Sequence, residues 1–152
     1  MAERRFEVEV VVDAPLEAVR AAIPDAPSII ELNPLVASYR LVKTEGKTEH
    51  YEILDRVRVL GFAMPVRYAA AITPVEGGFD SSTASPGRLT TTNQLRFGAS
   101  ARGTWVRELV VMRGPPLVVG FAAKTAERAH ETMLRTLRER VERTARGERI
   151  AS

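Results

Sequence analysis

The chain opens with an alternation of apolar and polar positions. In residues 6–12, FEVEVVV, the apolar side chains at the even positions fall on one face, and Glu7 and Glu9 fall on the other. Successive side chains of a strand point to opposite faces, so this spacing predicts a β-strand that is half buried.

Prolines divide the next segment into two short helices. The first is predicted over residues 15–22, capped by Asp13, because proline is well tolerated in a first helical turn. Pro24 ends it, and a second helix is predicted over residues 25–32. Asn33 and the proline after it end that helix in turn.

Six further strands are predicted in the middle of the chain, where short apolar stretches alternate with glycine- and proline-containing turns. The predicted strands cover residues 37–45, 48–60, 64–75, 78–84, 89–98 and 103–112. Every connection between them is short, so consecutive strands are expected to pair in an antiparallel manner.

The spacing changes after the sequence Gly114-Pro115-Pro116. Apolar residues then recur three or four positions apart, which is typical of one face of a helix. This stripe consists of Val118, Ala122, Ala126, Ala129, Met133, Leu137 and Val141. A single helix is therefore predicted from about Pro116 to Arg146, with Gly147 in a terminating position.

This order of elements predicts an α+β fold in a single domain of residues 1–152. A seven-stranded sheet has one face to cover, and the C-terminal helix is the only element long enough to lie across it. We therefore expect a curved antiparallel sheet wrapped around that helix, with the two short helices closing one end.

Composition excludes several classes of protein. The 152 residues are 45% hydrophobic and 27% charged and contain no cysteine, so no disulfide framework is expected. His50 and His130 are the only histidines, and neither stands in a metal-ligand pattern, so neither a metal nor another cofactor is predicted. Without a signal-peptide pattern or a long apolar run, we expect a cytoplasmic protein, either a monomer or a homodimer.

A sequence pI of about 9.7 raises the question of nucleic-acid binding. The excess of positive charge lies in residues 114–152, where arginines alternate with glutamates along the predicted helix. Interspersed opposite charges are typical of a solvated helix face, and no aromatic residues lie between them to stack on bases. Nucleic acid is therefore not a predicted partner.

Three segments carry a family resemblance. They are VVVDAPLEAV at residues 10–19, IIELNPLVASYRLV at residues 29–42 and GTWV at residues 103–106. With the order of elements, the chain resembles the START-like superfamily, also called birch-pollen-allergen-like or helix-grip, and within it the polyketide cyclase/dehydrase and coenzyme Q-binding branch. The resemblance implies a ligand cavity between sheet and helix. Members bind lipids, sterols, quinones or polyaromatics, and some cyclise or dehydrate polyketides.

Two carboxylates are in phase with apolar faces of the predicted strands. Asp55 shares a face with Tyr51 and Ile53, and Glu108 shares one with Val106. If both faces point inward, each carboxylate is a candidate for proton transfer or for recognition of a ligand hydroxyl, since burial raises its pKa. The alternatives are a bulge that turns an acid outward, or pairing with a nearby arginine.

Other residues are predicted to bind a ligand because they share a phase with apolar neighbours or lie near the expected cavity. The predicted set is Tyr51, Asp55, Phe62, Met64, Tyr68, Thr91, Asn93, Glu108, Phe121, Ala129 and Met133. His130 lies one position off the helical stripe, so we expect a structural or exposed histidine rather than a general base, and we expect His50 to be solvated.

The turn around Gly61 is unusually apolar. Leu60, Phe62 and Met64 occupy positions that polar residues normally fill. Such a cluster either folds into the core or marks a ligand mouth, a protein contact or a membrane contact. Residues 60–64 are thus a candidate for transient contact with a membrane or another protein.

Three functions remain open. The first is binding or transport of a hydrophobic small molecule without catalysis. The second is an enzyme of the polyketide aromatase/cyclase type, with Asp55 or Glu108 moving protons. The third is a protein-interaction module or assembly cofactor that docks through the apolar turn.

Overall fold

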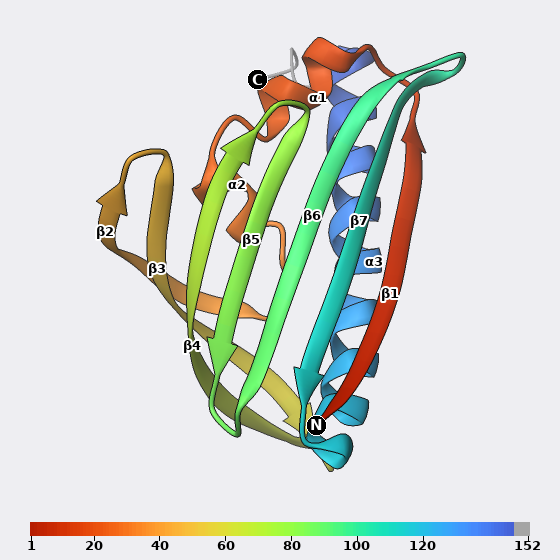
Figure 1. The fold of residues 1–152 in the computed structure, drawn as a ribbon. Helices are drawn as coiled ribbons and strands as arrows, with labels where there is room; N and C mark the ends of the chain where they lie inside the picture. Colours follow the sequence, from red (N-terminus) through yellow and green to blue (C-terminus); the bar gives the residue numbers. More distant parts are fainter. Residues whose placement is uncertain (148–152) are drawn as a thin grey trace.

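The computed structural model describes residues 1–147 and contains one antiparallel sheet and three helices (Figure 1). In chain order the elements are β1 (Ala2–Val12), α1 (Leu16–Ala22), α2 (Ala26–Ile30), β2 (Val36–Glu45), β3 (Thr48–Val59), β4 (Phe62–Val75), β5 (Gly78–Ser85), β6 (Leu89–Ser100), β7 (Gly103–Gly114) and α3 (Pro116–Ala145). Each predicted strand and helix is present.

The seven strands lie in the order β1-β7-β6-β5-β4-β3-β2, and every neighbouring pair is antiparallel. The first strand therefore adds to the last, and the remaining strands follow as a meander. α3 lies against one face of this sheet, which we call the inner face, and packs chiefly on β1, β7 and α1 (Figure 1). The predicted α+β helix-grip fold, a curved sheet around the C-terminal helix, is confirmed.

The hydrophobic core lies between the inner face and the second half of α3. Val12, Val106, Leu134 and Leu137 are almost fully buried there. α1 closes this end of the sheet through Val19, which is also fully buried. The other half of α3 packs less completely against the sheet, and this difference positions the candidate site.

The apolar stripe of α3 follows the prediction only from Ala129 onward. In the first turns Val119 and Ala123 are buried against β7, whereas the predicted Val118 is 39% exposed. The helix begins close to the end of β7, so the face that packs on β7 is rotated by about one residue from the predicted stripe. The predicted face, which includes Ala122, lines a cavity instead of packing on β7.

The predicted cap of the first helix is wrong, and the second helix has a cap that was not predicted. The N-cap of α1 is Pro15, without a side-chain hydrogen bond. Asp13 lies two residues before this position, too early for its side chain to cap the helix. It remains exposed, and its backbone N–H donates to Glu142 Oε2 of α3 over 2.8 Å. Asp25 does cap α2, and its Oδ1 accepts from the Ser28 N–H at 3.0 Å.

Candidate functional site

A cavity of about 540 Å³ lies between the inner face of the sheet and the first half of α3. Most of its wall is apolar. The sheet contributes Val57, Met64, Val66, Leu89 and Met112, and the helix contributes Val118, Phe121, Ala122, Ala126 and Ala129. The polar lining includes Asp55, Tyr68, Thr91 and His130. A mostly apolar cavity with a few polar groups is typical of a site for a small organic ligand.

Asp55 and Tyr68 come from neighbouring strands, β3 and β4, and point to the inner face. The continuous register of this pair sets Asp55 opposite Val66 and Tyr68 opposite Ile53, with no bulge to turn the acid outward. The Tyr68 hydroxyl donates to Asp55 Oδ1 over 3.2 Å. Asp55 is only 8% exposed, and no hydrogen bond or ion pair joins its carboxyl group to an arginine within residues 1–147.

His130 forms a second polar group with two residues of the sheet. Its Nδ1 lies 2.9 Å from Glu108 Oε1, and the Asn93 amide donates to Glu108 Oε2 over 2.6 Å. A carboxylate can only accept, so the imidazole holds its proton on Nδ1. Nε2 makes no hydrogen bond to any described residue and belongs to a side chain that lines the cavity. The ring also packs near Phe6, with centroids 5.8 Å apart.

The environment shifts the pKa values of these groups. Burial raises the pKa of Asp55 to about 6, although the hydrogen bond from Tyr68 and the nearby His130 partly oppose this rise. Burial and the adjacent Asp55 also raise the pKa of Tyr68. For His130, burial alone would lower the pKa, but Glu108 and Asp55 outweigh it and the pKa is raised. The shift brings the pKa of Asp55 closer to neutral pH, and the raised pKa of His130 favours the protonated imidazole.

The structure separates the predicted ligand-binding residues into three groups. Around the cavity lie Asp55, Met64, Tyr68, Thr91, Phe121 and Ala129. Glu108 and Asn93 are linked to it through His130. Farther away lie Met133, which is buried in the core, Tyr51, which is buried and donates to Glu49 over 3.1 Å, and Phe62, which is 75% exposed on the turn between β3 and β4.

His130 is the residue whose place sequence reasoning missed. We expected a structural or exposed histidine; its side chain is 14% exposed and pairs with a Glu108 side chain that is 2% exposed, which fits the first alternative and not the second. The pairing with Glu108 was not predicted. The signal was present in the sequence as an inward acid on the last strand and a histidine beside the apolar stripe of the helix. It could not be used without knowing how α3 is rotated on the sheet.

The apolar turn lies at the end of the sheet from which Met64 and Leu89 line the cavity. The turns after β3 and β5 and the start of α3 are at the same end of the molecule (Figure 1). Leu60 is 93% exposed and Leu117 is 90% exposed. Leu60 and Gly61 both have positive φ, as in a two-residue hairpin turn that ordinarily selects asparagine and glycine. A leucine in this backbone conformation leaves an apolar side chain in solvent at the cavity mouth.

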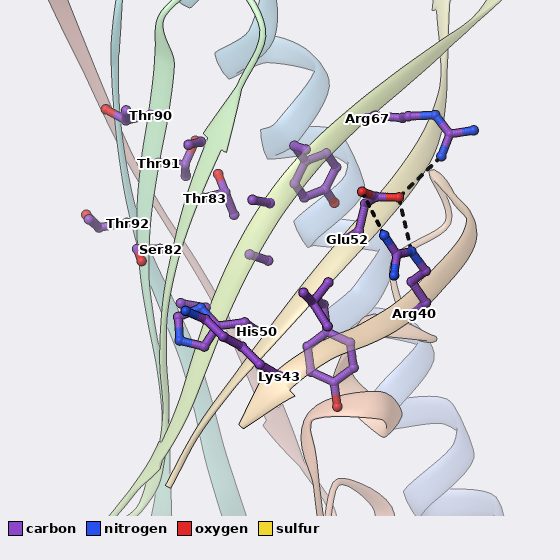
Figure 2. A pocket seen from close by; sticks show the side chains of 17 residues that line it. Arg40, Lys43, His50, Glu52, Arg67, Ser82, Thr83, Thr90, Thr91 and Thr92 are labelled. Carbon is purple, nitrogen blue, oxygen red and sulfur yellow. Dashed lines mark hydrogen bonds and ion pairs between the residues drawn. The ribbon is translucent and has the colours of Figure 1, made fainter. Parts of the chain in front are cut away.

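A second and larger hollow, of about 820 Å³, lies over the outer face of the sheet (Figure 2). Glu52 is shared there between Arg40 and Arg67, with Nε–Oε1 and Nη1–Oε1 distances of 3.3 Å and 3.5 Å. The outward side chains between these ions and β6 are small: Ala69, Ala71, Ser82, Ala84, Thr90 and Thr92. His50 also lies at this hollow, where its Nε2 is 2.8 Å from Glu45 Oε1.

Within residues 1–147, no group of three or more histidine, cysteine or acidic side chains is arranged to hold a metal ion. Over the same part of the chain, no helix is both long and apolar enough to span a membrane.

Solved structures with the same fold include an aromatase/cyclase. The aromatase/cyclase ZhuI from a Streptomyces species is 12% identical, with a TM-score of 0.76 over 95% of this chain and 96% of that one. The protein TTHA0849 from Thermus thermophilus is 21% identical, with a TM-score of 0.66 over 92% and 97%. The di-domain ARO/CYC StfQ from the steffimycin biosynthetic pathway is 13% identical, with a TM-score of 0.74 over 94% of this chain and 52% of that one.

These likenesses confirm the START-like, helix-grip fold. A search of the curated proteins finds none that matches the sequence. The model of one protein family, described as a domain of unknown function, DUF7053, matches residues 12–143. Because this match covers most of the chain, the protein belongs to the DUF7053 family.

Proposed function

We propose that this protein binds a hydrophobic small molecule, such as a lipid, a quinone or a polyaromatic compound, in the cavity between the sheet and α3. The observation that carries the proposal is the polar group buried in that cavity. Asp55 is nearly buried against Tyr68 in an otherwise apolar space. A protein gains no stability from an acid placed this way, because burial of a charge costs free energy. A role in holding a ligand accounts for it.

The walls of the cavity would supply most of the affinity. Each Å² of apolar ligand surface removed from water contributes about 25 cal/mol, so a ligand that buries about 200 Å² gains about 5 kcal/mol before the costs of ordering. The polar groups would then orient the ligand rather than hold it, since a hydrogen bond to protein replaces one to water.

The apolar turn supports a route for the ligand. Leu60, Phe62 and Leu117 are exposed at the end of the molecule where β4, β6 and α3 begin and where Met64, Leu89 and Val118 line the cavity, so we place its mouth there. A ligand that is poorly soluble would pass from another apolar surface over these side chains to the cavity, so transient contact with a membrane or a carrier protein belongs to the same proposal.

Catalysis of the aromatase/cyclase type is a second candidate, and the pairing of His130 with Glu108 favours it. Glu108 fixes the imidazole through Nδ1, which leaves Nε2 for a substrate, with Asp55 as a second group of different basicity. One group would remove a proton from a methylene carbon between two ketones. The enolate would then bond to another ketone carbon, whose oxygen takes up a proton from the other group and becomes a hydroxyl. Loss of this hydroxyl as water, with the remaining proton of the former methylene carbon, would form a carbon–carbon double bond.

Turnover separates the two candidates. A short poly-β-ketone mimic is incubated with the protein and followed by mass. A binding protein returns it unchanged, whereas an enzyme forms the product that has lost water, and His130→Gln abolishes this reaction while the mimic still binds.

Native mass spectrometry of protein purified from its own host tests the binding proposal. We expect a fraction of the protein to carry an added mass that organic solvent extracts. Ala126→Trp, which fills the cavity from α3, should remove this mass, and Lys124→Trp on the exposed face of the same helix should retain it. A mass retained in both variants would place the ligand elsewhere and contradict the proposal.

A further inference from the structure

The inner end of the cavity has more acid than base. Asp55 and Glu108 approach His130 from the sheet, and both influence its pKa. Arg67 is the remaining cation among the cavity-lining residues, but its guanidinium is 69% exposed and lies 3.5 Å from Glu52 on the outer face. Apart from the His130 imidazole, which Glu108 already holds, the described residues at this buried polar end supply no cation to set against its two carboxyl groups.

The buried polar end also has more unused hydrogen-bond acceptors than unused donors. Apart from the Thr91 hydroxyl, and from His130 Nε2 when the imidazole is protonated, the donors at this end are already engaged: Tyr68 donates to Asp55, and Asn93 and His130 Nδ1 donate to Glu108. The acceptors are not. A carboxylate accepts several hydrogen bonds, and Tyr68 is the only described residue that donates one to the Asp55 side chain. The Asn93 Oδ1 atom is also buried and has no partner among residues 1–147, although Asn93 does not itself line the cavity.

We infer that the cavity selects hydrophobic molecules whose buried end donates hydrogen bonds, such as a hydroxyl or an amine, and rejects molecules that end in a carboxylate. This inference rests on the proposed function and narrows its ligand class: aromatic or aliphatic alcohols, phenols and amines fit, and free fatty acids do not.

Two physical effects produce this selection. A donor satisfies acceptors that are buried and otherwise unpaired, and an unpaired buried polar group is costly. A ligand carboxylate would instead bring a further negative charge beside Asp55 and Glu108 in a region of low dielectric, where repulsion is poorly screened. The pKa of Asp55, about 6, leaves this group mostly ionised at pH 7.5, so that repulsion is present under ordinary conditions.

Three probes with one fluorescent ring system test the inference: pyrenemethanol, pyrenemethylamine and pyrenecarboxylate. Each is titrated at about pH 7.5, with Ala126→Trp as the blocked reference. We expect the alcohol and the amine to bind at least about tenfold more tightly than the carboxylate, which corresponds to only modest Coulomb repulsion. If pyrenemethylamine binds tightly and pyrenemethanol does not, the positive charge of the amine accounts for its binding, and recognition of a hydrogen-bond donor does not. That outcome would overturn the inference for alcohols.

Variants then assign the effect to Asp55. Asp55→Asn should tighten pyrenecarboxylate binding by about tenfold and thus remove most of the discrimination. Tyr68→Phe, which keeps the charge, should preserve the discrimination. Glu52→Gln makes the same change of charge on the outer face of the same strand and should alter nothing.

The outcomes distinguish failure of this inference from failure of the binding proposal. Equal or tighter binding of pyrenecarboxylate in the unaltered protein overturns the inference and leaves the binding proposal standing. Failure of all three probes to bind contradicts the binding proposal and the inference with it. The ranking in the unaltered protein decides the question even if Asp55→Asn does not fold.

Discussion

The two hollows of this protein differ in a way that volume does not describe. The outer one is larger, at about 820 Å³ against about 540 Å³, but its charged side chains are exposed and pair with one another (Figure 2). The inner one contains acids that the fold has removed from water. The difference teaches that the burial of ionisable groups, rather than the size of a depression, marks the candidate site.

One ion pair from each face shows the contrast. On the outer face Arg40 and Glu52 are 3.3 Å apart, with side chains that are 65% and 40% exposed. On the inner face His130 and Glu108 are 2.9 Å apart, with side chains that are 14% and 2% exposed. Exposed pairs contribute little to stability, whereas removing one partner of a buried pair leaves the other uncompensated.

The largest expected effect is on the inner pair. Glu108→Ala should lower the free energy of unfolding by about 3 to 5 kcal/mol, because it leaves His130 and Asn93 without their partner. Glu52→Ala should lower it by at most about 1 kcal/mol. Chemical denaturation at neutral pH measures both, and equal losses would show that the two faces do not differ as described.

The next effect is the pH dependence of stability. Asp55 has a pKa of about 6 in the folded protein against a model value of 3.8. Between these two pKa values the folded state binds more protons than the unfolded state. The free energy of unfolding therefore falls as pH rises, and the loss reaches about 2 kcal/mol by about pH 6. The raised pKa of His130 acts in the same direction at higher pH, since its stabilisation is lost as pH rises through the folded-state value.

Asp55→Asn should remove the part of this slope between about pH 4 and pH 6. On the outer side the sign is opposite. The contact with Lys43 lowers the pKa of Glu45, so any stability that it contributes is lost as pH falls. Chemical denaturation across this pH range gives the free energy of unfolding of the unaltered protein and of Asp55→Asn. If the two proteins show the same dependence on pH, the burial of Asp55 is contradicted.

The smallest stability effect is expected at the cavity mouth. Phe62→Asp should slow the uptake of pyrenemethanol about threefold to tenfold, because the ligand loses an apolar surface on its route. The free energy of unfolding should change by less than about 1 kcal/mol, since Phe62 is 75% exposed. The control is Val42→Asp, an apolar residue at the outer hollow that is 52% exposed. Stopped-flow fluorescence that finds the same rate in both variants would remove the turn from the route.

The sequence predicted the sheet almost completely, because strand alternation and turn residues are local signals. It also placed Asp55 and Glu108 inward, since a period of two fixes the face wherever no bulge intervenes. What it could not supply was the rotation of α3. Val118 and Val119 are both apolar, and only contact with β7 decides which of them is buried. The place of His130 depends on the same rotation, so the pair with Glu108 was not predicted.

A matched pair of tryptophan variants tests the central claim most directly. Ala126→Trp fills the inner cavity and Ala71→Trp fills the outer hollow, and both start from an alanine that lines the space in question. Fluorescence titration with pyrenemethanol should show affinity reduced by more than about tenfold in Ala126→Trp and changed by less than about twofold in Ala71→Trp. Loss of affinity in Ala71→Trp with full binding in Ala126→Trp would contradict the account and assign the ligand to the outer face.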